Sequence, residues 1–121
     1  MLNQGDGTFA VAVDYDAGFY PQSVAIGDVD GVNGPDVAVA HFNSDDVSVL
    51  LNQGDGTFAV AVDYDAGLQP GSVAIGELDG VNGLDLAVAS RFTHNVSVLL
   101  NQGNGTFVAA VAYPVGNETP A

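Results

Sequence analysis

Two acidic turns contain the residues of this sequence whose types and spacing best suit the binding of a metal ion. The first reads DVDGVNGPD from Asp28 to Asp36, and the second reads ELDGVNGLD from Glu77 to Asp85. Each gathers carboxylates and amide oxygens in a short turn, and calcium takes about six to eight oxygen ligands. Aspartate, asparagine and glycine also form plain turns, because their side chains bond to the neighbouring backbone. A calcium site and a purely structural turn therefore both remain open.

The acidic turns recur because the whole sequence is repetitive. The run LNQGDGTFAVAVDYDAG extends from Leu2 to Gly18, returns unchanged from Leu51 to Gly67, and begins a third time at Leu100. Leu51 follows Leu2 by 49 residues, and a fixed period of this length is typical of an array of structural repeats. The sequence opens inside a repeat unit and shows no signal peptide, so we expect a piece of a longer or engineered array.

Four short segments of each unit have the composition of β-strands. In the first unit they are residues 23–27, 36–41, 47–52 and 57–64, all rich in valine, alanine or phenylalanine and bounded by turn residues. Several are apolar on both faces, as in a sheet covered on each side. We predict an all-β fold, a β-propeller of four-stranded antiparallel blades with about two blades plus an extra strand per chain. A β-solenoid or a two-sheet sandwich is the alternative.

The predicted units divide the chain within a single repeat domain, residues 1–121. Residues 1–18 are the outer strand of a partial blade, residues 19–67 are blade 1, residues 68–116 are blade 2, and residues 117–121 are a tail. Two blades cannot close a ring, and each end would expose apolar side chains. We therefore expect a homo-oligomer in which three or four chains complete a propeller head to tail. A fragment that needs its missing blades is the alternative.

The chain resembles the FG-GAP/VCBS repeat over residues 23–58, which read SVAIGDVDGVNGPDVAVAHFNSDDVSVLLNQGDGTF, and the resemblance extends over essentially the whole chain. This repeat is the blade unit of integrin α-subunit propellers and of many bacterial secreted proteins. The resemblance implies a propeller with calcium in the loop between the first two strands of a blade. It also implies binding rather than catalysis, and an extracellular or cell-surface parent protein.

The resemblance also assigns candidate calcium ligands within each acidic turn. The candidate metal ligands are Asp28, Asp30, Asn33 and Asp36 in the first turn, and Glu77, Asp79, Asn82 and Asp85 in the second. The repeat normally has a ligating aspartate at the fifth place, where this chain has Val32 and Val81. The asparagine follows one residue later, so either it replaces the missing ligand or the site has been lost.

The two copies differ mainly at residues 41–46 and 19–22, compared with residues 90–95 and 68–71. In an antiparallel meander these segments lie at the end of the blade opposite to the acidic turns. Loops carry recognition on a fixed scaffold, so we expect a ligand-recognition face there, although neutral drift in exposed loops would give the same pattern. The candidate ligand-binding residues are Tyr20, His41, Phe42, Asn43, Arg91, Phe92 and His94.

The composition limits the partners and the activity. Fifteen acidic residues against one basic residue give a net charge of −14, which opposes binding to nucleic acid and to anionic membranes. No catalytic residue is predicted, because His41 and His94 differ in repeat position and no serine has a histidine at a useful spacing. We predict a non-enzymatic module whose partners are itself and a glycan or protein ligand. The alternatives are a lectin-like, carbohydrate-binding propeller and a designed scaffold without a ligand.

Overall fold

The computed structural model describes residues 2–8, 14–15, 20–67, 69–90 and 93–115. These residues form the strands β1 (Pro21–Gly27), β2 (Asp36–His41), β3 (Asp46–Leu50), β4 (Val62–Asp65), β5 (Pro70–Gly76), β6 (Asp85–Ser90), β7 (Asn95–Leu99) and β8 (Val111–Pro114). The described part of the chain is all-β, as predicted. Among these residues no helix is long and apolar enough to span a membrane.

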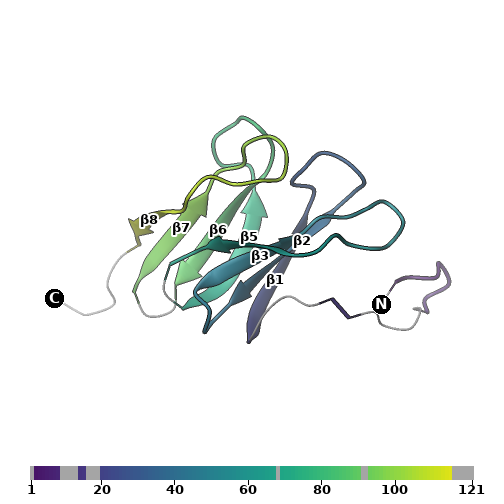
Figure 1. Cartoon of the computed structure of the whole chain (residues 1–121), viewed down its shortest axis with the longest axis horizontal. Coiled ribbons are helices and arrows are strands. Elements are labelled where there is room, and N and C mark those ends of the chain that lie inside the picture. The colour runs from purple at the N-terminus through teal and green to yellow at the C-terminus, as the bar shows by residue number, and fades with distance from the viewer. Residues whose placement is uncertain (1, 9–13, 16–19, 68, 91–92, 116–121) are drawn as a thin grey trace.

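The strands form two antiparallel sheets, ordered β1-β2-β3-β4 in blade 1 and β5-β6-β7-β8 in blade 2. The sheets lie side by side in Figure 1, and each is an up-and-down meander, as expected for a propeller blade. In blade 1, Ala25 lies opposite Ala38 and Val39 lies opposite Ser48. The same pairings recur in blade 2, so the sequence repeat is a repeat of strand register.

The outer strand of each blade is shorter than the sequence predicts. The composition predicts a strand over residues 57–64, whereas β4 pairs with β3 only over Val62–Asp65. A single bridge joins Asn52 and Phe58 just after the intervening turn, and the N–H of Ala59 donates to the oxygen of Leu51 at 2.8 Å. This strand forms the rim of the sheet, where water can satisfy the backbone, so the ladder need not be continuous.

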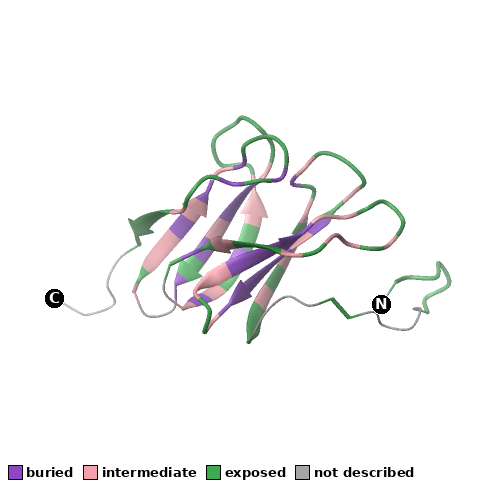
Figure 2. Ribbon diagram, in the orientation of Figure 1, coloured by how far each residue is buried: buried purple, intermediate pink, exposed green. Residues whose placement is uncertain are grey.

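The core lies between the two sheets. Residues opposite one another on neighbouring strands share a face, and we call the face of blade 1 that meets blade 2 its trailing face. The trailing face of blade 1 buries Ala38, Ala40, Val47 and Val49. The face of blade 2 that packs on it, which we call the leading face, buries Val73, Leu86, Val88 and Leu99. Figure 2 accordingly shows burial in the central strands and exposure in the loops and β8.

The two ends of each blade carry different loops, as the meander predicts. At one end the amide of Asn52 donates to the oxygen of Pro35 at 2.8 Å, so the acidic turn contacts the NQGDGT turn. At the other end the N–H groups of Ala66 and Gln69 donate to the backbone and side-chain oxygens of Asp45, at 3.0 and 2.8 Å. The nearly invariant turns and the variable segments therefore lie at opposite ends of the blades.

Candidate functional site

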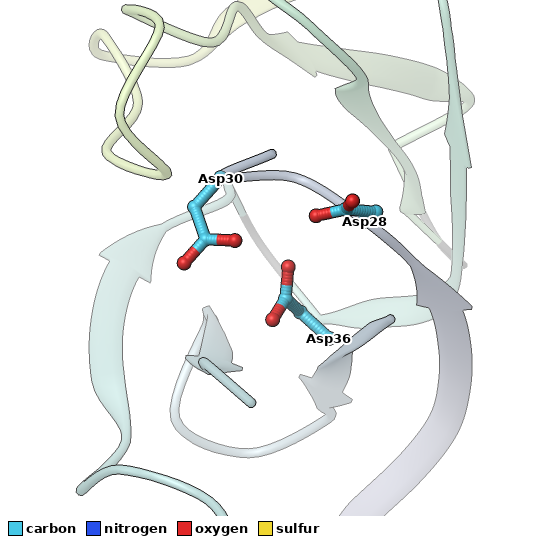
Figure 3. Close-up of side chains that lie close together, drawn as sticks. All are labelled: Asp28, Asp30 and Asp36. Atoms are coloured by element: carbon cyan, nitrogen blue, oxygen red, sulfur yellow. The ribbon is translucent and has the colours of Figure 1, made fainter. Parts of the chain in front are cut away.

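The first acidic turn brings three carboxylates together at the end of β1. One oxygen from each of Asp28, Asp30 and Asp36 lies within 4.8 Å of the others. Figure 3 shows that the three side chains converge on a common space. Asp28 is exposed, Asp30 is half-buried and Asp36 is fully buried. In the second turn, Glu77, Asp79 and Asp85 form the same kind of group.

Asp36 and its copy Asp85 also hold the blade together. The two carboxylate oxygens of Asp36 accept the N–H groups of Val29 and Asn52, both at 2.8 Å. Asp85 accepts the N–H groups of Leu78 at 2.9 Å and Asn101 at 2.8 Å. Each aspartate therefore ties its acidic turn to the neighbouring NQG turn from a position without solvent exposure.

The more exposed carboxylates bond to the backbone of their own turn. Oδ1 of Asp28 accepts the N–H of Gly31 at 2.9 Å, and Oδ1 of Asp30 accepts the N–H of Val32 at 3.1 Å. Such bonds shape an ordinary turn without any cation. A carboxylate has about four lone-pair sites, so these bonds leave capacity for a cation as well.

The asparagine of each acidic turn lies against the next turn of its own blade. Asn33 has a positive φ of 62°, and its Oδ1 is 2.9 Å from the place of a Cβ on Gly54. Val32, at the fifth place, is 55% exposed and carries no oxygen. Even without an oxygen from the fifth place, the three grouped carboxylates supply oxygen ligands of the kind that Ca²⁺ prefers. This set of ligands therefore fits a hard cation.

A buried polar network links three strands of blade 1. Nε2 of His41 lies 2.7 Å from Oγ of Ser48, and this hydroxyl donates to Oδ1 of Asp63 at 2.5 Å. His41 and Ser48 are only 1% and 0% exposed. Sequence spacing did not reveal this contact, which arises because β2 lies beside β3. The serine proton points to the carboxylate, so we interpret the network as a structural link between strands.

Asp46 adjoins this network, since it lies opposite His41 in the sheet. Burial raises the pKa of Asp46 and the charge of Asp63 raises it further, whereas His41 lowers it. Oδ1 of Asp46 is buried and has no hydrogen-bond partner among the described residues. The ionised form of this side chain is therefore disfavoured by folding.

We expect Asp46→Asn to stabilise the chain at neutral pH. A carboxyl whose pKa is raised by folding lowers stability when it is ionised, and protonation removes that cost. The gain in the free energy of unfolding should be below about 1 kcal/mol at pH 7, because the group is partly hydrated. It should vanish as the pH falls through the pKa of Asp46. Urea unfolding across this pH range measures it, and a loss at pH 7 would show that the charge is needed. Asn95, the copy of Asp46, shows that asparagine fits the strand.

The predicted ligand-binding residues differ in exposure. Tyr20 is 67% exposed, and Asn43 and His94 are also exposed. His41 instead lies within the buried network, so its ring is not at the surface of the single chain. Arg91 and Phe92 lie outside the described residues.

The variable loops have an unusual backbone that recurs in both blades. Tyr20 and its copy Gln69 have positive φ values of 51° and 50°, and Asp45 and its copy His94 have values of 60° and 57°. Because different side chains share this conformation, the geometry of the blade imposes it. Phe42 lines a shallow hollow between these loops together with Asn43, Asp45 and Gln69.

Comparison with known proteins shows the fold and no more. No protein-family model and no curated protein matches the chain. A solved structure of the Photorhabdus luminescens Tc holotoxin pore is similar, with a TM-score of 0.54 and 23% sequence identity. The similarity covers 84% of this chain but 5% of that chain, so this chain spans a small part of that protein's length.

Proposed function

We propose that the chain is a non-enzymatic propeller module of the FG-GAP/VCBS type, which assembles head to tail with copies of itself into a closed ring. The supporting observation is that several side chains that are buried between the two blades have exposed copies at the two ends of the chain. Val73 of the leading face of blade 2 is 6% exposed, and Ile75 beside it is half-buried. Their copies in blade 1, Val24 and Ile26, are 61% and 70% exposed.

The opposite end of the chain shows the same contrast. On the trailing face of blade 1, Ala40 and Val47 are fully buried and Tyr64 packs edge to face on Phe107. Their copies on the trailing face of blade 2 are exposed or half-buried, and they are Ala89, Val96 and Tyr113. The two free faces thus carry the side chains that already fit each other within the chain.

A contact between these free faces would continue from copy to copy. It is heterologous, because one copy contributes the trailing face and the next contributes the leading face, and rotation closes such contacts into rings. Three or four chains with two blades each would make a ring of the size usual for propellers. The exposed valines and isoleucine would then be covered, which removes an aggregation hazard.

Light scattering coupled to size-exclusion chromatography tests the assembly. We expect the wild-type chain to have the mass of three or four copies at micromolar concentration, and Ile26→Asp to be a folded monomer, since an unpaired carboxylate in an apolar contact is costly. The matched change Ile75→Asp places the same charge between the chain's own blades, and it should unfold the protein. A wild-type chain that stays a folded monomer would contradict the assembly.

We propose Ca²⁺ as the ligand of the acidic turns, supported by the grouped carboxylates of Asp28, Asp30 and Asp36 and their copies. Excess calcium should raise the melting temperature relative to chelator, and a ligand at about one hundred times its Kd adds about 2.7 kcal/mol. The double change Asp30→Asn with Asp79→Asn should abolish this shift, whereas Asp55→Asn in the NQGDGT turn should keep it. Calorimetry measures the shift, and equal melting temperatures with calcium and chelator would rule the ion out.

The variable end of the blades is the surface that we propose for recognition of a glycan or protein. The hollow beside Phe42 and the exposed ring of Tyr20 support this assignment, because loops on a rigid scaffold commonly carry binding residues. An extracellular setting belongs to the same proposal.

A further inference from the structure

The N-terminal segment, residues 2–15, repeats residues 51–64 letter for letter. The described residues of this segment also make contacts that correspond to those of residues 51–64. The ring of Tyr15 packs edge to face on Phe58, with centroids 5.5 Å apart and an interplanar angle of 82°. Tyr64 packs on Phe107 in the same way, at 5.4 Å and 84°. Tyr15 therefore contacts blade 1 as the outer strand of blade 1 contacts blade 2.

The start of the segment agrees with this placement. Cδ1 of Leu2 lies 2.9 Å from the place of a Cβ on Gly56. Leu51, the copy of Leu2, lies 3.3 Å from the same place on Gly105, the copy of Gly56. Leu2 and Tyr15 of the N-terminal segment thus lie where the corresponding residues of a preceding blade would lie.

In the ring proposed above, two segments compete for this position beside blade 1. One is the N-terminal segment itself, and the other is residues 100–115 of the preceding copy, which include β8. We propose that the N-terminal segment of each copy stays on its own blade 1 and pairs with β7 of the preceding copy, replacing residues 100–115 there. This inference rests on the proposed head-to-tail assembly and names the segment that links one copy to the next.

Side-chain chemistry favours the exchanged strand. In blade 1, Ser48 donates a hydrogen bond across the sheet to Asp63. In blade 2 the corresponding Ser97 lies opposite Ala112, whose side chain has no acceptor. Asp14 is the copy of Asp63 in the N-terminal segment. Pairing of this segment with β7 would therefore give Ser97 the acceptor that β8 lacks.

The strand that would be displaced, β8, buries none of its own residues. All four residues of β8 are exposed, and Pro114 within it has no N–H for the ladder. The buried residues of the displaced segment are Asn101, Gly105 and Phe107, and they have counterparts of the same type at positions 3, 7 and 9. Exchange would thus retain the buried residue types and replace the least buried strand.

Engineered disulfides distinguish the two pairings, because the chain has no cysteine of its own and opposed cross-strand residues lie close enough to be bridged. The pair Asp14→Cys with Ser97→Cys should join copies into covalent multimers on a non-reducing gel. The pair Ser97→Cys with Ala112→Cys should leave most chains unlinked. Ser48→Cys with Asp63→Cys should close within one chain, which controls for oxidation and folding.

The outcomes separate this inference from the assembly on which it rests. Multimers that form mainly through the first pair support strand exchange. Closure of the second pair within single chains, with the assembled mass retained in light scattering, would overturn strand exchange and leave the ring intact. A monomeric wild-type chain would overturn both. If the cysteine pair at positions 14 and 97 and the pair at positions 97 and 112 both form disulfides, the pair with the higher yield decides between the pairings.

Discussion

Replacing Asp85 with alanine should lower the free energy of unfolding by about 2–4 kcal/mol, because the buried N–H of Asn101 and the part-buried N–H of Leu78 lose their acceptor, and a buried donor without an acceptor costs about 1–3 kcal/mol. The carboxylate accepts the N–H groups of Leu78 and Asn101, and its side chain is fully buried. Without it, the acidic turn loses its link to the NQG turn at the end of blade 2. Urea unfolding in the presence of chelator measures this structural role separately from any bound cation.

Two matched variants sharpen this prediction. Asp79→Ala removes an exposed carboxylate from the same turn, and surface changes of this kind usually fall within about 0.5 kcal/mol. Asp85→Asn retains one acceptor oxygen and should therefore cost less than Asp85→Ala. Equal stability of Asp85→Ala and Asp79→Ala would mean that water satisfies both N–H groups, and that the buried aspartate does not hold the turns together.

Local features of the sequence were sufficient to predict the blade. The segment DVAVAH coincides with β2, because its small β-forming residues are bounded by turn residues on both sides. The arrangement of loops at opposite ends followed from the alternation of antiparallel strands alone. The fourth strand was predicted too long, because composition does not show where an edge strand leaves the ladder.

The dual role of Asp36 could not be read from the sequence. In the sequence, Asp36 cannot be distinguished from an aspartate that only binds a cation. In the structure, its carboxylate accepts the N–H group of Val29 in its own turn and that of Asn52 in the next turn. The second contact depends on how two turns pack, not on spacing within one turn. The carboxylates were nevertheless predicted to be neighbours, since they share one short loop.

The network of His41, Ser48 and Asp63 was missed for a different reason. Residues far apart in sequence meet when their strands are paired, so a search for a histidine near a serine in the chain fails. A signal did exist in the comparison of the two copies. His41 becomes Ser90 and Asp63 becomes Ala112, and in the register of the sheet both positions lie on the face that carries Ser48. Differences between repeats should therefore be compared along faces rather than along the chain.

Substitution by valine should affect different properties at two glycines of the same repeat position, the stability of the single chain at Gly27 and the assembly at Gly76. A Cβ on Gly27 would lie 2.8 Å from Cγ2 of Ile75 and 3.4 Å from Cδ1 of Leu84, whereas a Cβ on Gly76 meets no atom within 4 Å. Neither glycine has a positive φ, so the backbone itself accepts a side chain at both positions. Gly27→Val should therefore destabilise the chain by about 1–3 kcal/mol through overpacking between its own blades.

Gly76→Val should leave the stability of the single chain unchanged and abolish the assembly. In the proposed ring, Gly76 meets Ile26 of the next copy as Gly27 meets Ile75 within the chain, so the added methyl groups would collide only on association. Unfolding of dilute samples and light scattering of concentrated ones measure the two effects separately. A Gly76→Val chain that retains the wild-type assembled mass would show that contacts between copies do not repeat the contact between blades. The pair therefore tests the geometric equivalence on which the ring depends, with the fold of the monomer as its internal control.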